Sequence, residues 1–429
     1  MSKDVMSMTA AVYTLGCKVN QYESQVICEE LLKSGYEVVP PDRAADVYIV
    51  NSCTVTAESD RKTRQAVRRL KRMNPNAALV LTGCVPQAYP EVAAELPQAD
   101  ILLGNKSNDK IIEALTEWFR DKSRLILTDM HNNIDKFCVT SIKDFHERTR
   151  ANVKIEDGCD RFCAYCIVPH ARGRARSKPL KLLREEVRGL AESGFQEIVL
   201  VGINLSAYSD GGHDLCDAVE TAASFGPVKR VRLGSLEPDH LTDGMIGRLS
   251  RIEKLCPQFH ISLQSGCDET LRAMSRHYIA AEYEALCRKL REIFPGAALT
   301  TDIMVGFPGE TDENFRDTMA FTEQIGFEKA HVFPYSKRPG TKAADMPGHL
   351  PKSVKEQRCR ELTALADRIR HDFLKAQIGR TVEVLVEENN SGYTKNYIPV
   401  QIVDMYQKQG FVNIKITDAD EDTCFGYVE

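Results

Sequence analysis

The chain has 429 residues, of which 43% are hydrophobic and 27% are charged, and its formal net charge is -5. This composition is ordinary for a soluble globular protein, the length is too great for one ordinary domain, and the charge argues against a wholly basic nucleic-acid binder. No signal peptide is evident at the N-terminus, and no apolar run approaches the roughly 20 residues of a transmembrane helix. We therefore expect a cytosolic protein, in which clustered cysteines are metal ligands or catalytic groups rather than disulfides.

The first section, residues 8–140, alternates strand-like and helix-like segments. Residues 20–35 have the pattern of a helix that ends at Gly35, and Ser59 or Asp60 is expected to cap the next helix. The expected strands are residues 10–15, 46–53, 77–84 and 99–104. Such alternation predicts a Rossmann-like α/β domain with a parallel sheet covered by helices. The charged residues 141–150 are expected to form a linker.

The second section, residues 145–375, repeats this alternation with longer helices. Its expected strands are residues 152–157, 196–202, 229–235, 259–264, 298–306 and 329–335. Six such units predict a partial (β/α)6 barrel, whose chemistry belongs at the carboxyl ends of the strands. A final helix is expected over residues 352–379.

The pattern changes again after Gly379, and the third section is residues 376–429. The β-branched runs 381–388, 398–406 and 411–417 predict a small all-β barrel. Residues 380–429 contain four Lys+Arg and nine Asp+Glu, which gives a net charge of -5. That charge is unfavourable for RNA binding by this section. Three of its tyrosines, Tyr393, Tyr397 and Tyr406, would stack on bases or, as is more usual in a small barrel, form its core.

Three cysteines, Cys159, Cys163 and Cys166, are spaced C-x3-C-x2-C after the first strand of the second section. Three thiolates on one loop can bind three irons of a [4Fe-4S] cluster and leave the fourth iron open to a small molecule. Zinc is the rival, with His170 as a fourth ligand, but this spacing is not usual for structural zinc. The sequence therefore favours an iron–sulfur cluster here.

Three further cysteines, Cys17, Cys53 and Cys84, each follow an expected strand of the first section. The carboxyl ends of parallel strands lie side by side at the edge where open α/β sheets bind ligands. Gly16 and Gly83 each precede a cysteine, and glycine lets the backbone turn tightly around a cofactor. We therefore weigh convergence on a second cluster against chance placement, and the glycines favour convergence.

Two basic segments accompany the cysteines. Residues 61–72 include seven basic residues, and on a helix Ala66, Val67, Leu70 and Met73 would form its buried stripe. The second segment, residues 171–184, directly follows the C-x3-C-x2-C loop. Phosphate contacts from these segments are expected to dominate RNA affinity. The expected RNA-binding residues are Arg61, Arg64, Arg68, Arg72, Arg172, Arg174 and Arg176.

The C-x3-C-x2-C motif, with Tyr165 before its last cysteine at the start of a six-strand section, resembles the radical S-adenosylmethionine enzymes. The resemblance implies that the open iron chelates S-adenosylmethionine, which is then cleaved to a 5′-deoxyadenosyl radical. The segments "LVGIN", "LGSLEP" and "DIMVGFPGET" resemble those that cradle the cofactor in these enzymes. Gly202, Glu237 and Gly306 are therefore expected to contact it.

All six cysteines, in "GCKVNQYES", "NSCTVT", "TGC" and "GCDRFCAYC", match the methylthiotransferases one by one. This resemblance covers essentially the whole chain, and the third section is similar to the TRAM domain, a small barrel associated with RNA binding. "TLGCKVNQYES" resembles the branch that acts on N6-threonylcarbamoyladenosine in tRNA, whereas the isopentenyladenosine branch typically has "GCQMN" there.

The resemblance implies methylthiolation of adenine C2 at the threonylcarbamoyladenosine next to the anticodon. It further implies two [4Fe-4S] clusters: Cys159, Cys163 and Cys166 hold the one that generates the radical, and Cys17, Cys53 and Cys84 hold an auxiliary cluster that carries the sulfur. The expected partners are the tRNA anticodon stem-loop, an electron donor and a sulfur donor, without a membrane. Three alternatives stay open: the isopentenyladenosine branch, a ribosomal-protein methylthiotransferase, and a non-catalytic metal-dependent RNA-binding protein.

Overall fold

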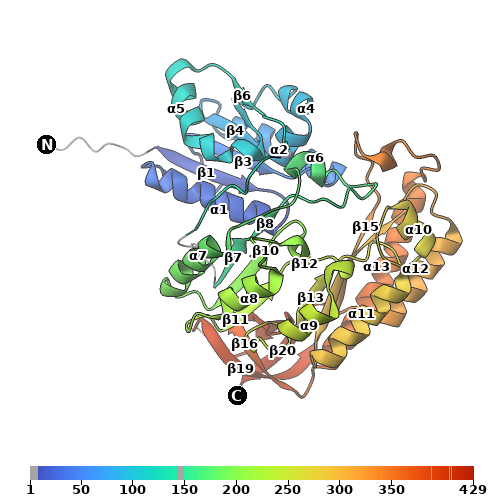
Figure 1. The fold of residues 1–429 in the computed structure, drawn as a ribbon. Helices are drawn as coiled ribbons and strands as arrows, with labels where there is room; N and C mark the ends of the chain where they lie inside the picture. Colours follow the sequence, from blue (N-terminus) through green and yellow to red (C-terminus); the bar gives the residue numbers. More distant parts are fainter. Residues whose placement is uncertain (1–7, 133, 143–148, 388, 405, 407) are drawn as a thin grey trace. The chain divides into compact units, whose positions relative to one another are not determined.

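The computed structural model describes residues 8–132, 134–142, 149–387, 389–404, 406 and 408–429 (Figure 1). The chain divides into two compact units. Unit 1 comprises Met1–Ile142, Glu156–Lys178 and Ser336–Ala344, and unit 2 comprises Lys143–Ile155, Pro179–Tyr335 and Asp345–Glu429. Most of the expected linker, residues 143–148, lies outside the described residues. The three domains 8–140, 145–375 and 376–429 remain a prediction.

A six-stranded parallel sheet forms the centre of unit 1, in the order β2-β1-β3-β4-β5-β6. Its strands are β1 (Thr9–Thr14), β2 (Glu37–Val38), β3 (Val47–Ser52), β4 (Ala78–Gly83), β5 (Ile101–Leu103) and β6 (Leu125–Leu127). The four expected strands are present and pair in parallel. β2 and β6 were not expected, because strands of 2 and 3 residues are too short to show a periodic pattern.

Helices cover both faces of this sheet (Figure 1). They are α1 (Lys18–Lys33), α2 (Ala57–Met73), α3 (Cys84–Ala88), α4 (Pro90–Ala94), η1 (Asn105–Lys110) and α5 (Ile111–Asp121). Because successive side chains of a strand point to opposite faces, Val50 packs against α2 on one face and Ile49 packs against α1 and α5 on the other. This arrangement confirms the Rossmann-like expectation.

The cap of α2 differs from the sequence expectation. Thr56 is the N-cap, and its hydroxyl oxygen accepts a hydrogen bond from the backbone N–H of Ser59 at 3.2 Å. The expectation of Ser59 or Asp60 as cap was wrong because the helix begins at Ala57, so both residues lie inside its first turn.

Unit 2 contains a partial barrel of parallel strands. They are β7 (Arg150–Lys154), β10 (Glu197–Val201), β11 (Arg230–Leu233), β12 (Ser235–Leu236), β13 (Gln258–Ile261), β14 (Ala298–Val305) and β15 (Lys329–Pro334). β7, β10 and β11 form one sheet, and β12 to β15 form another. Gly234 alone separates β11 from β12, so the two act as one interrupted strand and the expected six-unit pattern is present. Among the described residues β7 and β15 do not pair, which leaves the barrel open.

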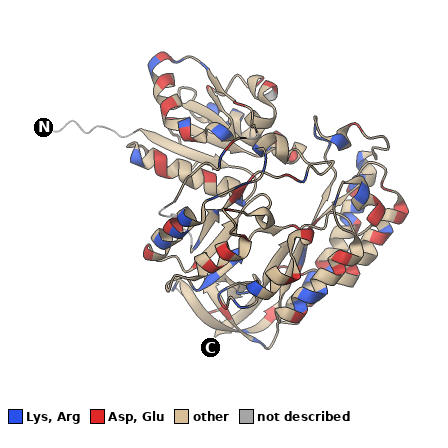
Figure 2. Cartoon of the chain, viewed as in Figure 1, with Lys and Arg blue, Asp and Glu red and all other residues tan. Residues whose placement is uncertain are grey.

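Helices follow the strands of this partial barrel. They are α7 (Leu180–Glu192), η2 (Leu205–Ala207), α8 (Leu215–Ala223), η3 (Pro238–His240), α9 (Asp243–Leu249), α10 (Asp268–Ala273), α11 (Ala280–Ile293), α12 (Asp312–Ile325) and α13 (Lys352–Lys375). Figure 2 shows charges of both signs interspersed along α11, α12 and α13. Of the helices that the structure describes, none is both long and apolar enough to cross a membrane.

The end of the chain folds as a small all-β barrel, as expected. The barrel is closed and has five strands, in the order β16-β17-β18-β20-β19, whereas the sequence indicated three strand-like runs. Its strands are β16 (Thr381–Val386), β17 (Ser391–Thr394), β18 (Pro399–Ile402), β19 (Gly410–Ala419) and β20 (Cys424–Val428). Tyr393 and Tyr397 stack on each other at 4.5 Å, and the guanidinium of Arg150 lies 4.7 Å from the Tyr393 ring. These two rings therefore join the small barrel to the start of β7.

Candidate functional site

The structure brings Cys17, Cys53 and Cys84 to one edge of the unit 1 sheet. Each lies between the end of a strand and the start of a helix: Cys17 is the N-cap of α1, Cys53 directly follows β3, and Cys84 is the first residue of α3. The three strands β1, β3 and β4 are neighbours in the sheet. The cysteines therefore occupy adjacent positions at its carboxyl edge.

Two glycines leave room for this arrangement. Gly16 has a φ of +106°, and a Cβ added there would lie 2.7 Å from the Cβ of Cys53 and 3.1 Å from its sulfur. Gly83 has a φ of +92°, and a Cβ there would lie 2.5 Å from Asn51 Oδ1. Only glycine combines this backbone conformation with such close approach. The site therefore fits a cofactor, such as an iron–sulfur cluster, that is bound by several thiols beside a tightly turned backbone.

The three thiols also interact electrostatically. The pKa of Cys84 is raised to about 12, mainly by burial; Arg172 acts to lower it, and negative charge on Cys53 and Cys17 acts to raise it. Burial likewise raises the pKa of Cys53, and charge on Cys17 adds to this effect. Without a metal these buried thiols are neutral near pH 7, whereas a bound metal would deprotonate them.

The second triplet lies on a loop closed by a short antiparallel ladder, β8 (Glu156–Asp157) with β9 (Arg176–Ser177). The Cys159 N–H donates to the Gly173 carbonyl at 3.0 Å, and the Cys166 N–H donates to the Cys163 carbonyl at 2.9 Å. A short helix, α6 (Val168–Arg172), follows the last cysteine. These bonds hold the three cysteines on one compact turn.

Both triplets lie in unit 1, although the loop follows β7 of the partial barrel in sequence. α6 packs against α3, the helix that begins at Cys84. The side-chain amide of Asn105 also donates to the Ala171 carbonyl at 2.7 Å. The two cysteine sets are therefore built into one folded unit, a grouping that sequence alone did not indicate.

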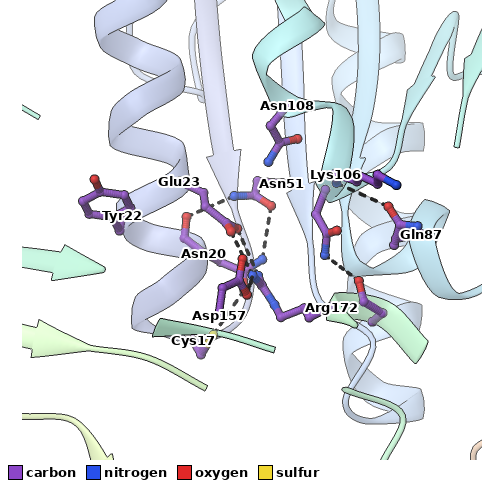
Figure 3. Close-up of polar contacts among 12 residues, drawn as sticks. Cys17, Asn20, Tyr22, Glu23, Asn51, Gln87, Lys106, Asn108, Asp157 and Arg172 are labelled. Carbon is purple, nitrogen blue, oxygen red and sulfur yellow. Dashed lines mark hydrogen bonds and ion pairs between the residues drawn. The ribbon is translucent and has the colours of Figure 1, made fainter. Parts of the chain in front are cut away.

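A buried polar network lies beside Cys17 (Figure 3). Asn20 Oδ1 accepts a hydrogen bond from the Cys17 thiol at 3.2 Å, and its Nδ2 donates to the Ser52 carbonyl at 3.0 Å. Glu23 pairs with Arg172. The sequence reasoning missed Asn20 and Glu23. The sequence signal that could have identified them is their spacing, because residues three apart on α1 share a helix face. In the structure this face is buried although its side chains are polar.

The zinc alternative requires His170 as a fourth ligand. His170 is exposed on α6. Among the described residues, no three His, Cys, Asp or Glu side chains are arranged to hold one metal ion. In a [4Fe-4S] cluster the thiolates are the ligands of a larger group, and each of three cysteines can bind a different iron. The donor set, thiols in triplets, fits such a cluster better than a single ion.

The three residues expected to contact the cofactor lie in unit 2, each just after a strand. Gly202 follows β10, Glu237 follows β12, and Gly306 follows β14. The Glu237 carboxylate accepts from Arg276 at 2.5 Å. Gly306 has a φ of +72°, and its N–H donates to the Glu310 carboxylate at 3.0 Å. A Cβ at Gly306 would lie 2.3 Å from Lys355 Cγ, so close packing already requires glycine at this position.

The arginines expected to bind RNA divide into two groups. Arg61, Arg64, Arg68 and Arg72 are exposed on α2, opposite a stripe in which Ala66, Val67 and Leu70 are buried. Arg174 is also exposed, and Arg176 is partly buried beside Asp157.

Arg172 differs from the expectation for an RNA contact. Its side chain is only 2% exposed, and it is paired with Glu23 at 2.8 Å and with Asp157 at 2.9 Å. A guanidinium that faces two carboxylates in the interior cannot contact a phosphate. The expectation for this residue is corrected: Arg172 forms buried ion pairs with Glu23 and Asp157 and does not bind RNA.

An open six-unit partial barrel with a C-x3-C-x2-C loop after its first strand defines a protein of the radical S-adenosylmethionine class. The Radical SAM superfamily model matches residues 153–322, and the model of Uncharacterized protein family UPF0004 matches residues 9–104. A solved radical S-adenosylmethionine methyltransferase, TsrM from Kitasatospora setae, shares the fold with a TM-score of 0.57 at 15% identity, over 79% of this chain and 77% of that one.

Curated relatives match over nearly the whole chain. The threonylcarbamoyladenosine tRNA methylthiotransferase MtaB of Thermotoga maritima is 38% identical over 92% of this chain and 91% of its own. The MtaB of Aquifex aeolicus is 35% identical over 92% and 96%. A tRNA-2-methylthio-N(6)-dimethylallyladenosine synthase of Caldicellulosiruptor saccharolyticus is 34% identical over 99% and 93%. The chain belongs to the radical S-adenosylmethionine methylthiotransferase family.

Proposed function

We propose that this protein methylthiolates C2 of the adenine ring of N6-threonylcarbamoyladenosine in tRNA, next to the anticodon. The convergence of Cys17, Cys53 and Cys84 at adjacent strand ends, in the same unit as the C-x3-C-x2-C loop, carries the proposal. The names of the MtaB relatives support the choice of modified base.

Two [4Fe-4S] clusters and S-adenosylmethionine, when bound, would supply the radical chemistry that attack on an unactivated C2–H bond requires, and the sulfur that is inserted there. Cys159, Cys163 and Cys166 would bind one cluster, and Cys17, Cys53 and Cys84 the other. Gly202, Glu237 and Gly306 would contact the S-adenosylmethionine. The contribution of the chain is to hold these groups on rigid strand ends and to exclude water from them.

Mass spectrometry of tRNA nucleosides, from cells with and without this chain, tests the function. In cells without the chain, N6-threonylcarbamoyladenosine should be found in place of its 2-methylthio derivative. The isopentenyladenosine derivatives should be unchanged. The reverse pattern would assign the chain to the other tRNA branch, whose relatives are 34–36% identical. Unchanged nucleosides would contradict a tRNA substrate.

We further propose that the arginines exposed on α2 contact phosphates of the anticodon stem-loop. Seven of the twelve residues 61–72 are basic, whereas helices α11 to α13 carry interspersed charges (Figure 2). Neutralisation of phosphates releases counterions, so each lost contact lowers both the affinity and its salt dependence.

The double substitution Arg64→Glu with Arg68→Glu should therefore weaken tRNA binding. The slope of log K against log salt should decrease in magnitude by about 1 to 2, because two phosphate contacts are lost. The matched control is Lys110→Glu with Arg120→Glu, an equal charge change at exposed positions in and before α5, a helix on the opposite face of the sheet. Equal slopes for both double variants in a salt titration would contradict the proposal.

A further inference from the structure

Arg172, at the end of α6, is almost fully buried, whereas Arg174, two residues later, is exposed. The Arg172 guanidinium donates to both carboxylate oxygens of Glu23, at 2.8 and 3.0 Å, and to Asp157 Oδ1 at 2.9 Å (Figure 3). Arginine stays charged in any protein environment, and burial of a charge is costly unless it is paired. A permanent positive charge and its counter-charges are therefore held at a defined place in the interior.

That place adjoins the strand-end cysteines. Asn20 Oδ1 accepts a hydrogen bond from Arg172 Nη2 at 3.3 Å and from the Cys17 thiol at 3.2 Å, so a single atom joins the two side chains. Asn20 Nδ2 donates to the carbonyl of Ser52, the residue before Cys53. Arg172 also acts electrostatically on the buried thiols of Cys53 and Cys84. The guanidinium is thus linked to Cys17 through Asn20 and is near enough to Cys53 and Cys84 to act on their charge.

Glu23 opposes this charge from the same helix that Cys17 caps. Its side chain is 8% exposed, and its negative charge acts on Cys84 in the opposite direction to that of Arg172. Charges in a weakly polar interior interact more strongly than in water, and the potential of an iron–sulfur cluster depends on the charge around it. One-electron reduction adds a negative charge to a cluster, which a nearby cation stabilises and a nearby anion destabilises.

We propose that Arg172 and Glu23 are positioning residues that set the reduction potential of the cluster bound by Cys17, Cys53 and Cys84, which Arg172 raises and Glu23 lowers. This inference rests on the proposed function, since it requires that cluster. It goes beyond that function because it assigns the potential to two residues that bind no iron. A merely structural salt bridge predicts a different outcome: loss of either partner would destabilise the fold without shifting the potential in opposite directions.

The test uses the full-length chain with Cys159, Cys163 and Cys166 replaced by Ala, so that one cluster remains. Its potential is measured by reductive titration followed by electron paramagnetic resonance. We expect Arg172→Gln to lower the ratio of reduced to oxidised cluster at a fixed potential about tenfold, or about 59 mV for one electron, and Glu23→Gln to raise it by a similar factor. Arg172→Lys keeps the charge and should stay close to the parent.

Lys71→Gln is the matched control, because it removes a partly buried cation of unit 1 that pairs with Asp100 at 2.7 Å, just before β5 at the opposite edge of the sheet. It should lower the melting temperature and leave the potential unchanged. Should Arg172→Gln fail to fold, Glu23→Gln still tests the sign of the shift, and Arg172→Lys still tests whether a variant that keeps the charge keeps the potential. Retained iron with unmoved potentials, or shifts in one direction, would overturn the inference alone. Absence of iron from the parent would instead overturn the proposed cluster, and the inference with it.

Discussion

Substitution of Cys53 by Ala should halve the iron content of the reconstituted protein, from about eight to about four irons per chain, because a [4Fe-4S] cluster is lost with its ligand. Cys53 lies between β3 and α2 and contributes to the strand-end set, whereas the C-x3-C-x2-C loop is closed by its own hydrogen bonds. Cleavage of S-adenosylmethionine should therefore continue. Methylthiolated nucleoside should fall to background, since the sulfur-carrying site is gone.

Iron analysis and chromatography of 5′-deoxyadenosine check this expectation together. Cys28→Ala is the matched control, because Cys28 lies on α1 of the same unit but belongs to neither triplet. It should retain about eight irons and full activity. An iron content for Cys53→Ala equal to that of the parent chain would refute the strand-end cluster.

The reciprocal substitution, Cys163→Ala, should have the larger effect on the first chemical step. Cys163 is buried at the centre of the loop, where the backbone carbonyl of this residue accepts from the Cys166 N–H. Loss of its thiolate removes one of three ligands, so 5′-deoxyadenosine formation should fall to background. About four irons per chain should remain, held by Cys17, Cys53 and Cys84.

The two variants distinguish two clusters from one shared cluster. If the six cysteines hold separate groups, each variant retains about half of the iron and only Cys53→Ala cleaves S-adenosylmethionine. If either variant loses all of its iron, the two sites are not independent. Continued 5′-deoxyadenosine formation by Cys163→Ala under anaerobic reduction would contradict the assignment of the loop.

Local sequence signals predicted most elements of the fold. Short continuous apolar runs within residues 46–53 and 77–84 marked β3 and β4, and the stripe Ala66, Val67 and Leu70 marked the buried side of α2. These signals are local, because the hydrophobic pattern of a helix or strand is contained in a short stretch of consecutive residues. The short strands β2 and β6 and the Thr56 cap carry too little local pattern and were missed or misplaced.

The sequence by itself identified the six cysteines as candidate ligands. Its alternation of strands and helices also predicted that Cys17, Cys53 and Cys84 follow neighbouring strands of a parallel sheet. Only the tertiary structure decided the burial and pairing of Arg172, since its partner Glu23 is 149 residues away and an arginine in a basic run has no local mark of burial. Likewise, only packing placed residues 156–178 with the N-terminal sheet rather than with the barrel whose first strand they follow. The physical reason is the same in both cases: the cost of burying a charge or a loop depends on partners that the chain supplies only after it has folded.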